Sequence, residues 1–333
     1  MTTEFSYDTL AEVVDAAEEA GARISDVVLA HEAEAAETGT EDLLAQMTSR
    51  LEVMDACIEP GCAADLRSPT GLTGGDAHRE REAVSQGRSL VGGVVGGALF
   101  RALAVSELNA AMGRIVAAPT AGSCGILPAA VLTMRDELGA GEEACVMSLF
   151  TAAGVGLVIE RNASLAGAEG GCQAETGSAA AMAAAAVVEL AGGTPAQAAD
   201  AVSIAIQSML GLVCDPVAGL VEVPCVKRNA SGVAMALVAA ELALAGCGAT
   251  IPADEAIAAM RRVGRAMPEA LRETAEGGLA TTPTALRLAE EIFGPGAAGG
   301  REQVSAAGRG VAAEGAARVS PRPCACGTCA ACR

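Results

Sequence analysis

The chain has 333 residues, of which 51% are hydrophobic but only 2% aromatic, and its formal net charge is −19. We expect no nucleic acid or anionic membrane as a partner, because both need a basic protein face. A core without tryptophan must be built from Ala, Val, Leu, Ile and Met, and Ala-rich cores let helices approach closely, which favours an all-α fold.

The N-terminal segment also bears on localisation. It has no basic stretch followed by a long apolar one, so we expect no secretory signal and a cytoplasmic protein. The longest apolar stretches are interrupted by Gly or by a charge, as at Arg101 and Glu241. Buried helices explain these stretches better than membrane spans, which need about 20 apolar residues in a row.

Apolar residues recur at helical spacing through most of the chain, and strand-like alternation is almost absent. The long helix that begins near residue 86 carries paired glycines, at which we expect a kink. Thr194 and Pro195 predict a helix start, with threonine as the N-cap and proline in the first turn. The expected helices are 8–20, 25–37, 40–57, 86–113, 126–138, 142–159, 176–191, 195–212, 228–246, 252–265 and 283–292.

The composition changes after Gly294 to a segment rich in Gly, Ala, Arg and Pro, which is typical of a linker. The sequence therefore predicts a single large helical domain over residues 1–293 and a flexible, cysteine-rich tail over residues 294–333. The tail ends with Cys324, Cys326, Cys329 and Cys332. This run is equally compatible with a metal site and with a redox-active tail that binds no metal.

Four polar loops stand out against the apolar helices, at residues 68–79, 118–125, 167–178 and 211–231. Binding residues are often found in loops that a rigid scaffold positions. The first two loops are rich in Ser, Thr and Gly, whose hydroxyl and backbone N–H groups could hold a carboxylate, helped by the helix N-termini that follow. Taken alone, each is equally compatible with an ordinary turn. The candidate residues are Ser68, Thr70, Gly71, Thr120, Gly122 and Ser123.

The other two loops contain three of the twelve cysteines, Cys172, Cys214 and Cys225. Thiols in turns rich in Gly, Pro, Asp and Glu are poor core residues and good metal ligands. Three thiolates would suit a [4Fe–4S] cluster that leaves one iron open to act as a Lewis acid. Their spacing is neither that of a ferredoxin nor that of a zinc finger, so scattered buried thiols remain an equal alternative. Cys145 and Cys247 are interpreted as small core residues.

Few other side chains in the sequence could carry chemistry. Of the two histidines, His31 is interpreted as a surface residue, whereas His78 follows the first loop and could reach a site. The single lysine, Lys227, could in principle form a Schiff base, but no phosphate-binding loop accompanies it. We expect Lys227 and Arg228 instead to lower the pKa of the Cys225 thiol and to offset the negative charge of a cluster.

Several stretches together resemble the α subunit of the iron–sulfur L-serine dehydratases. They are SPTGLTGGDA from residue 68, NAAMGRIVAAPTAGSCGILPA from 109, NASLAGAEGGCQAETGSAAAMAAAA from 162, MLGLVCDPVAGLVEVPCVKRNA from 209 and VGRAMPEALRETAEGGLATTPT from 263. These stretches cover most of residues 68–284 in the order found in that family. No feature of composition or spacing by itself points to serine.

The resemblance implies an all-helical catalytic domain that deaminates L-serine to pyruvate and ammonia at a [4Fe–4S] cluster. It places Cys172, Cys214 and Cys225 on the cluster and the first two loops at the serine site. Related enzymes use a cysteine near the C-terminus to cap the fourth iron, and Cys332 is the candidate here. The family also implies a β subunit, and we expect an oligomer.

Three alternatives stay open at this stage. One is a related lyase that acts on L-cysteine and releases sulfide. Another is a subunit that binds a cluster or scaffolds a partner without catalysis. The third is a metal-storage or redox-sensing protein centred on the tail. The general base is not identified by the sequence: His78 is one candidate, and a residue of the β subunit is another.

Overall fold

The computed structural model describes residues 7–296, and within them helices are joined by turns without any β-strand. The all-α prediction of a single helical domain is confirmed. One isolated parallel bridge joins Cys214 to Arg272. Cys332 and the other tail cysteines lie outside the described residues.

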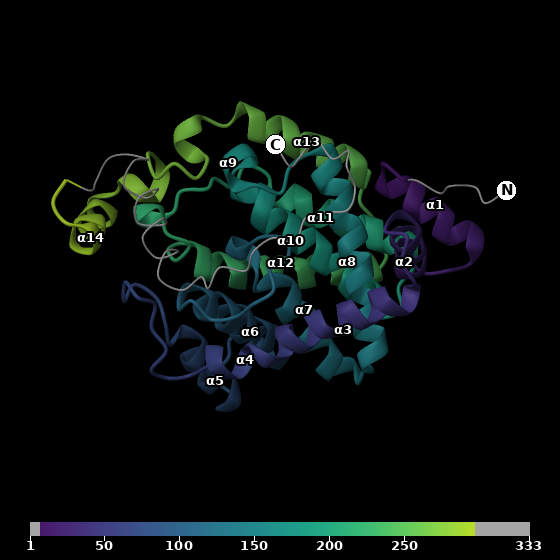
Figure 1. Cartoon of the computed structure of the whole chain (residues 1–333), viewed down its shortest axis with the longest axis horizontal. Helices are drawn as coiled ribbons and strands as arrows, with labels where there is room; N and C mark the ends of the chain where they lie inside the picture. Colours follow the sequence, from purple (N-terminus) through teal and green to yellow (C-terminus); the bar gives the residue numbers. More distant parts are fainter. Residues whose placement is uncertain (1–6, 297–333) are drawn as a thin grey trace, which may run out of the picture.

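The helix α10 (Ser178–Leu190) occupies the middle of the molecule (Figure 1). Its sequence, SAAAMAAAAVVEL, is apolar around the whole helix, and eleven of its residues from Ser178 to Val188 are buried. A helix that is hydrophobic on every side belongs in a core. Four helices pack around it: α7 (Ile126–Leu138), α8 (Glu142–Asn162), α11 (Pro195–Met209) and α12 (Cys225–Leu244).

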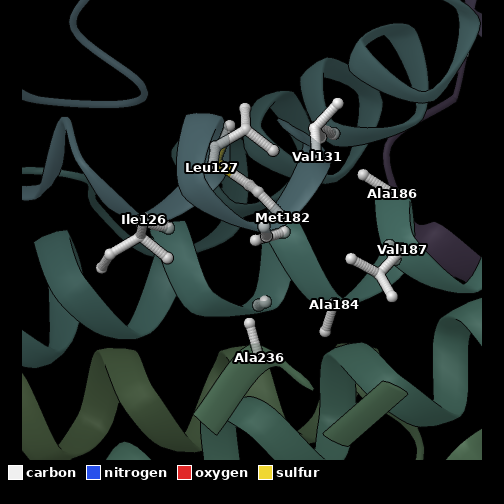
Figure 2. Close-up of a cluster of buried hydrophobic side chains, with 14 of the residues drawn as sticks. Ile126, Leu127, Val131, Met182, Ala184, Ala186, Val187 and Ala236 are labelled. Atoms are coloured by element: carbon white, nitrogen blue, oxygen red, sulfur yellow. The ribbon is translucent and has the colours of Figure 1, made fainter. Parts of the chain in front are cut away.

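Small side chains set the spacing of these helices. Figure 2 shows apolar side chains of α7, α10 and α12 gathered in the core, among them Leu127, Met182 and Ala236. Met182 is the large residue in the alanine helix, and Gly156 of α8 leaves room for it: a Cβ at Gly156 would lie 3.0 Å from the Met182 methyl carbon. Alanine and glycine therefore permit close helix approach, as the composition predicts.

The remaining helices cover this core. The two N-terminal helices α1 and α2 lie at one end and α14 lies at the other (Figure 1). Bounds are α1 (Leu10–Ala20), α2 (Ile24–Ala35), α3 (Thr40–Ala56), α4 (Ile58–Gly61), α5 (Asp76–Ser85), α6 (Gly92–Ala110), α9 (Gly167–Gly170), α13 (Ala253–Ala266) and α14 (Pro283–Phe293). Short 3₁₀ turns are η1 (Ala121–Ser123), η3 (Val217–Gly219), η4 (Glu269–Leu271) and η5 (Gly278–Thr281), and η2 (Gln173–Gly177) is a π-helical turn.

Several predicted boundaries differ from the structure by a few residues, and three of the differences bear on the loops. The helix expected from residue 86 begins at Gly92, because Gly87 and Gly92 adopt left-handed backbone angles with φ of +66° and +78°. The paired glycines thus stand in the first turns of α6 rather than at a kink. Helix α5 begins inside the segment predicted as loop 68–79, and Cys225 is the first residue of α12 rather than part of a loop.

Within residues 7–296, α8 alone is long and apolar enough to match a membrane span by length and composition. Of its most apolar window, 72% is buried inside the protein. Its place against α10 and α2 accounts for this composition, since the core helix of a folded domain has the same character.

Candidate active site

The loop that carries Cys172 is held from behind by α13. Gln173 has no exposed surface; its Nε2 donates to the Met260 carbonyl of α13 at 2.9 Å, and its Oε1 accepts from the Gly211 N–H at 2.9 Å. Gly264 of α13 lies against Gly170, where a Cβ would come 2.8 Å from the Gly170 Cα. Gln173 therefore connects the Cys172 loop to α13 and to the segment that leads to Cys214.

Cys214 is fixed through its backbone. Its N–H donates to the Leu271 carbonyl at 2.9 Å, and its carbonyl accepts from the Glu273 N–H at 2.8 Å. The next residue, Asp215, accepts from the Leu279 N–H at 2.7 Å and pairs with Arg228 at 2.8 Å. The Cys214 thiol thus stands on a segment held on one side by residues 271–279 and on the other by α12.

Cys225 begins α12, and Asn229 one turn later connects it to the second loop. The Asn229 Nδ2 donates to the Cys225 carbonyl at 3.0 Å and to the Gly122 carbonyl at 2.7 Å, and its Oδ1 accepts from the Gly125 N–H at 2.8 Å. Asn229 is fully buried. This single side chain places the start of α12 beside the loop at 118–125.

The three thiols act on one another electrostatically. Burial, then the charges of Cys172 and Glu175, raise the pKa of Cys225 to about 12. Burial and then the charges of Glu175 and Cys172 raise the pKa of Cys214 as well. Burial also raises the pKa of Cys172, against the opposing hydroxyl of Thr176 and charge of Arg228. These mutual effects show that the thiols of two loop residues and of a helix start lie within electrostatic range of one another; their role as joint ligands stays a prediction.

A bound metal cation would oppose these upward shifts in pKa, because it favours the thiolate form. In the described part of the chain, no three His, Cys, Asp or Glu side chains are grouped so that they could hold one metal ion. Cys172, Cys214 and Cys225 therefore do not form a single-ion site.

Arg228 is the cation whose charge acts on Cys172 and Cys225. Its side chain is 16% exposed, and it donates to the Val213 carbonyl at 2.8 Å besides pairing with Asp215. Lys227 is 76% exposed and pairs with Asp76 of α5 at 2.8 Å. The expectation that this basic pair lowers the pKa of Cys225 is therefore wrong: only the Arg228 charge acts in that direction, and burial outweighs it, whereas Lys227 joins α12 to α5.

The first polar loop meets the segment before Cys225 at Glu222, a side chain that is only 5% exposed. The Thr70 and Thr73 hydroxyls donate to its two carboxylate oxygens at 2.7 and 2.8 Å. Ser68 lies 3.1 Å from the Thr70 hydroxyl, and Gly71 adopts a left-handed φ of +76° in this turn. The predicted loop residues Ser68, Thr70 and Gly71 therefore form one hydrogen-bonded unit.

The second polar loop meets the thiols at Glu175. The Thr120 hydroxyl donates to Glu175 at 2.8 Å and lies 3.1 Å from the Ser123 hydroxyl. The other carboxylate oxygen lies 3.8 Å from the Cys214 sulfur. A Cβ at Gly122 would lie 3.1 Å from Glu175, so this glycine lets the loop close on the carboxylate. Burial raises the pKa of Glu175, with the Thr120 hydroxyl opposing.

His78 stands in the first turn of α5, next to the first loop. Its Nε2 lies 3.7 Å from Glu82, and its Nδ1 is buried without a hydrogen-bond partner within residues 7–296. Its part in catalysis stays a prediction. The side chain of His31 is only 14% exposed and packs against the Tyr7 ring in a tilted arrangement, so the surface interpretation of His31 is wrong. Cys145 is buried as predicted, whereas Cys247 is exposed in the turn after α12.

Sequence reasoning missed Glu175, Glu222, Gln173 and Asn229. Each lies within four positions of one of the three cysteines, and that proximity was the available signal. Acidic and amide residues in loops are usually solvated, so their burial was not evident from the pattern.

Comparison with known proteins agrees with this geometry. Residues 19–280 match the family described as the serine dehydratase alpha chain. The chain belongs to this family. The resemblance inferred from the loop sequences is therefore confirmed.

Two relatives named as alpha chains are similar over nearly their whole length, and a longer relative is similar over part of its length. A probable L-serine dehydratase alpha chain of Bacillus subtilis is 50% identical over 300 residues, which cover 90% of this chain and 99% of the relative. The L-serine dehydratase alpha chain of Peptoniphilus asaccharolyticus is 44% identical over 289 residues, 87% of this chain and 99% of the relative. The L-serine dehydratase of Streptomyces coelicolor is 38% identical over 281 residues, which cover 83% of this chain but 61% of that longer protein.

Proposed function

We propose that this chain is the α chain of an L-serine dehydratase, a carbon–oxygen lyase that converts L-serine to pyruvate and ammonia. The observation that carries the proposal is the 50% identity to a probable L-serine dehydratase alpha chain over 99% of that protein's length. Two contacts support it: the second hydroxyl-rich loop and the Cys214 sulfur share Glu175, and the first loop bonds Glu222, three residues before Cys225. Polar groups that converge in this way suit a small polar substrate.

We further propose a [4Fe–4S] cluster on Cys172, Cys214 and Cys225. The donor set fits: three thiols from different segments act on one another electrostatically, and the Arg228 charge acts on two of them, Cys172 and Cys225. A [4Fe–4S] cluster would take its thiolates on different irons, so it would not require the three sulfurs to converge on one ion. Gly167 fits as well, because a Cβ there would lie 3.1 Å from the Cys214 sulfur. Lys227 as a cofactor-binding residue and Cys332 as the cap of the fourth iron stay predictions.

When bound, a cluster with one open iron supplies a Lewis acid that makes a hydroxyl group a better leaving group. The chain's own residues have other tasks. The loops at Ser68–Gly71 and at Thr120–Ser123 bind and orient the serine, so that its Cα–H bond is aligned for elimination. The carboxylates of Glu222, which is buried, and of Glu175, which is half-buried, fix the hydroxyls of these loops before the substrate arrives.

Removal of the α-proton requires a base. His78 is our candidate within this chain, because its Nδ1 has no partner among the described residues and its helix starts from the first loop. The β chain is the other source we propose. This chain covers 99% of the Bacillus subtilis relative named as an alpha chain, but only 61% of the longer L-serine dehydratase of Streptomyces coelicolor. The part of the longer protein that this chain does not cover supports a second component.

The test is turnover by the anaerobically purified and reconstituted chain, with and without a co-expressed β chain. Pyruvate is measured from L-serine and from L-cysteine in parallel. We expect pyruvate from L-serine only when the β chain is present. Full turnover by the chain alone would refute the need for a β chain, and a preference for L-cysteine with sulfide release would refute the serine assignment.

A further inference from the structure

A polar hollow of about 180 Å³ lies where α13 packs against α9 and the end of α8 (Figure 1). Its floor is buried and includes Gln173 and Met260, which join the Cys172 loop to α13. Its rim is charged: Arg261 and Arg265 come from α13, and Glu169 comes from α9. The residues that line it, all from the described part of the chain, include no cysteine and no member of the two hydroxyl-rich loops, so this hollow is not the candidate active site.

The charges on the rim of this hollow are not paired with one another. Within residues 7–296, neither Arg261 nor Arg265 makes an ion pair or a hydrogen bond, although acidic residues outnumber basic ones 41 to 22 in the chain. Glu169 accepts from the Ser164 hydroxyl at 2.7 Å through one oxygen, and its other oxygen has no partner in this part of the chain. Opposite charges that surround one hollow without pairing across it complement a ligand that carries both signs.

The two arginines lie four positions apart, which puts their side chains on one face of α13. Like charges at this spacing repel each other and cost about 0.2–0.5 kcal/mol when nothing neutralises them. The helix dipole favours cations near the end of α13, but it does not require them to share a hollow. Arg262, on the same helix, is exposed and does not line the hollow. The guanidinium groups of Arg261 and Arg265 offer planar sets of N–H donors that suit carboxylates.

We infer that this hollow binds a small acidic amino acid, with its carboxylates on Arg261 and Arg265 and its ammonium group on the unpartnered oxygen of Glu169. Two guanidinium groups and one carboxylate give the rim one net positive charge, which matches an amino acid with one net negative charge, such as L-aspartate. The volume is below that of pockets for drug-sized ligands and suits a small metabolite. The inference goes beyond the proposed function, because it uses neither the thiols nor the hydroxyl-rich loops.

The floor of the hollow links this site to the Cys172 loop. Gln173 directly follows Cys172 and donates to the Met260 carbonyl at 2.9 Å, and Arg261 is the next residue of α13. A ligand held between Glu169 and α13 would therefore join the same two segments as the Gln173 side chain does. A ligand that binds only the folded state stabilises it, so L-aspartate should raise the melting temperature of the chain.

The experiment compares L-aspartate with succinate, which lacks only the amino group. Binding is measured by calorimetry and by the melting temperature on the full-length chain, both reconstituted and metal-free, at about 0.15 M ionic strength to screen distant charges. We expect L-aspartate to bind with a Kd on the order of 1 mM, because exposed charges each contribute little, and succinate to bind at least about threefold more weakly. Unspecific attraction to the arginines would instead favour succinate, which carries more negative charge.

Four variants of exposed residues assign the contacts, and surface substitutions of this kind leave the fold intact. We expect Arg261→Gln and Arg265→Gln each to weaken L-aspartate binding about fivefold or more, and the matched control Arg262→Gln to change it less than about twofold. Glu169→Gln should weaken L-aspartate binding but strengthen succinate binding, because it removes the partner of the ammonium group and the repulsion of a carboxylate.

Three results would each overturn the inference. They are the absence of saturable L-aspartate binding by the wild type, an equal loss of binding in Arg262→Gln and Arg261→Gln, and succinate binding as tight as that of L-aspartate. Failure to release pyruvate from L-serine would instead refute the proposed function, since binding in this hollow is measured without turnover.

Discussion

Replacing Gln173 with alanine tests whether one buried amide sets the spacing between the Cys172 and Cys214 loops. The wild-type side chain has no exposed surface and joins the Met260 carbonyl to the Gly211 N–H. Alanine removes both hydrogen bonds, one to a carbonyl inside α13 and one from the N–H of the exposed Gly211. Each hydrogen bond contributes about 0.5–1.5 kcal/mol, so we expect Gln173→Ala to lower the free energy of unfolding by about 1–3 kcal/mol.

This loss leaves a protein of ordinary stability folded, because domains typically have about 5–15 kcal/mol. The variant should therefore remain soluble while holding iron more weakly, by about 10-fold or more, as for changes in the groups that orient metal ligands. The assays are equilibrium urea unfolding of the metal-free chain and iron bound per chain at limiting iron, both under anaerobic reducing conditions.

Gln197→Ala is the matched control. Gln197 is also a glutamine that donates to backbone carbonyls, at Ala243 and Leu244, but these lie at the end of α12 opposite to Cys225. We expect it to bind iron like the wild type. The reasoning would be refuted if Gln173→Ala unfolded with the wild-type free energy, or if both variants lost iron to the same extent.

Three further predictions concern the surroundings of the thiols. Gly167→Ala should lower the iron bound per chain, because the new Cβ would lie 2.6 Å from a Glu175 oxygen. The control Gly141→Ala, where a Cβ meets nothing within 4 Å, should bind as much iron as the wild type. Equal amounts of iron in the two variants would contradict the packing argument. Burial raises the pKa of the Cys62 thiol to about 11, above the value of about 8.5 for a thiol in an unfolded chain, so the folded state holds the proton more tightly. The free energy of unfolding of the metal-free chain should therefore fall as the pH rises from about 8.5 to 11. Urea unfolding should show a weaker pH dependence in Cys62→Ala, and a pH dependence equal to that of the wild type would contradict the argument. Deleting residues 320–333 should leave most of the bound iron and sulfide in place, and complete loss of metal would favour a metal site in the tail.

The helices could be predicted from the sequence because their cause is local. Apolar spacing along the chain, the Thr194–Pro195 start and the alanine-rich segment that became α10 all act within one helix. Helix α5 was missed for the opposite reason. Its residues are mostly polar, and its first N–H groups are capped by Glu107, which comes from another helix. A cap supplied from a distant segment leaves no pattern near the helix that it starts.

The candidate site shows the same division. The three cysteines and the two hydroxyl-rich loops could be selected from residue type, and the family resemblance brought them together. The carboxylates and amides that hold these loops could not be selected, because Glu222 and Asn229 bond to residues more than a hundred positions away in the sequence.

The most direct test of the thiol site is a count of iron and sulfide on the reconstituted chain, in the wild type, in Cys172→Ser and in Cys247→Ser, whose thiol is exposed. We expect about four irons and four sulfides per chain, with visible absorbance, in the wild type and in Cys247→Ser. Cys172→Ser should lose the iron, the sulfide and the absorbance. A Cys172→Ser chain that kept its iron, sulfide and absorbance would contradict it.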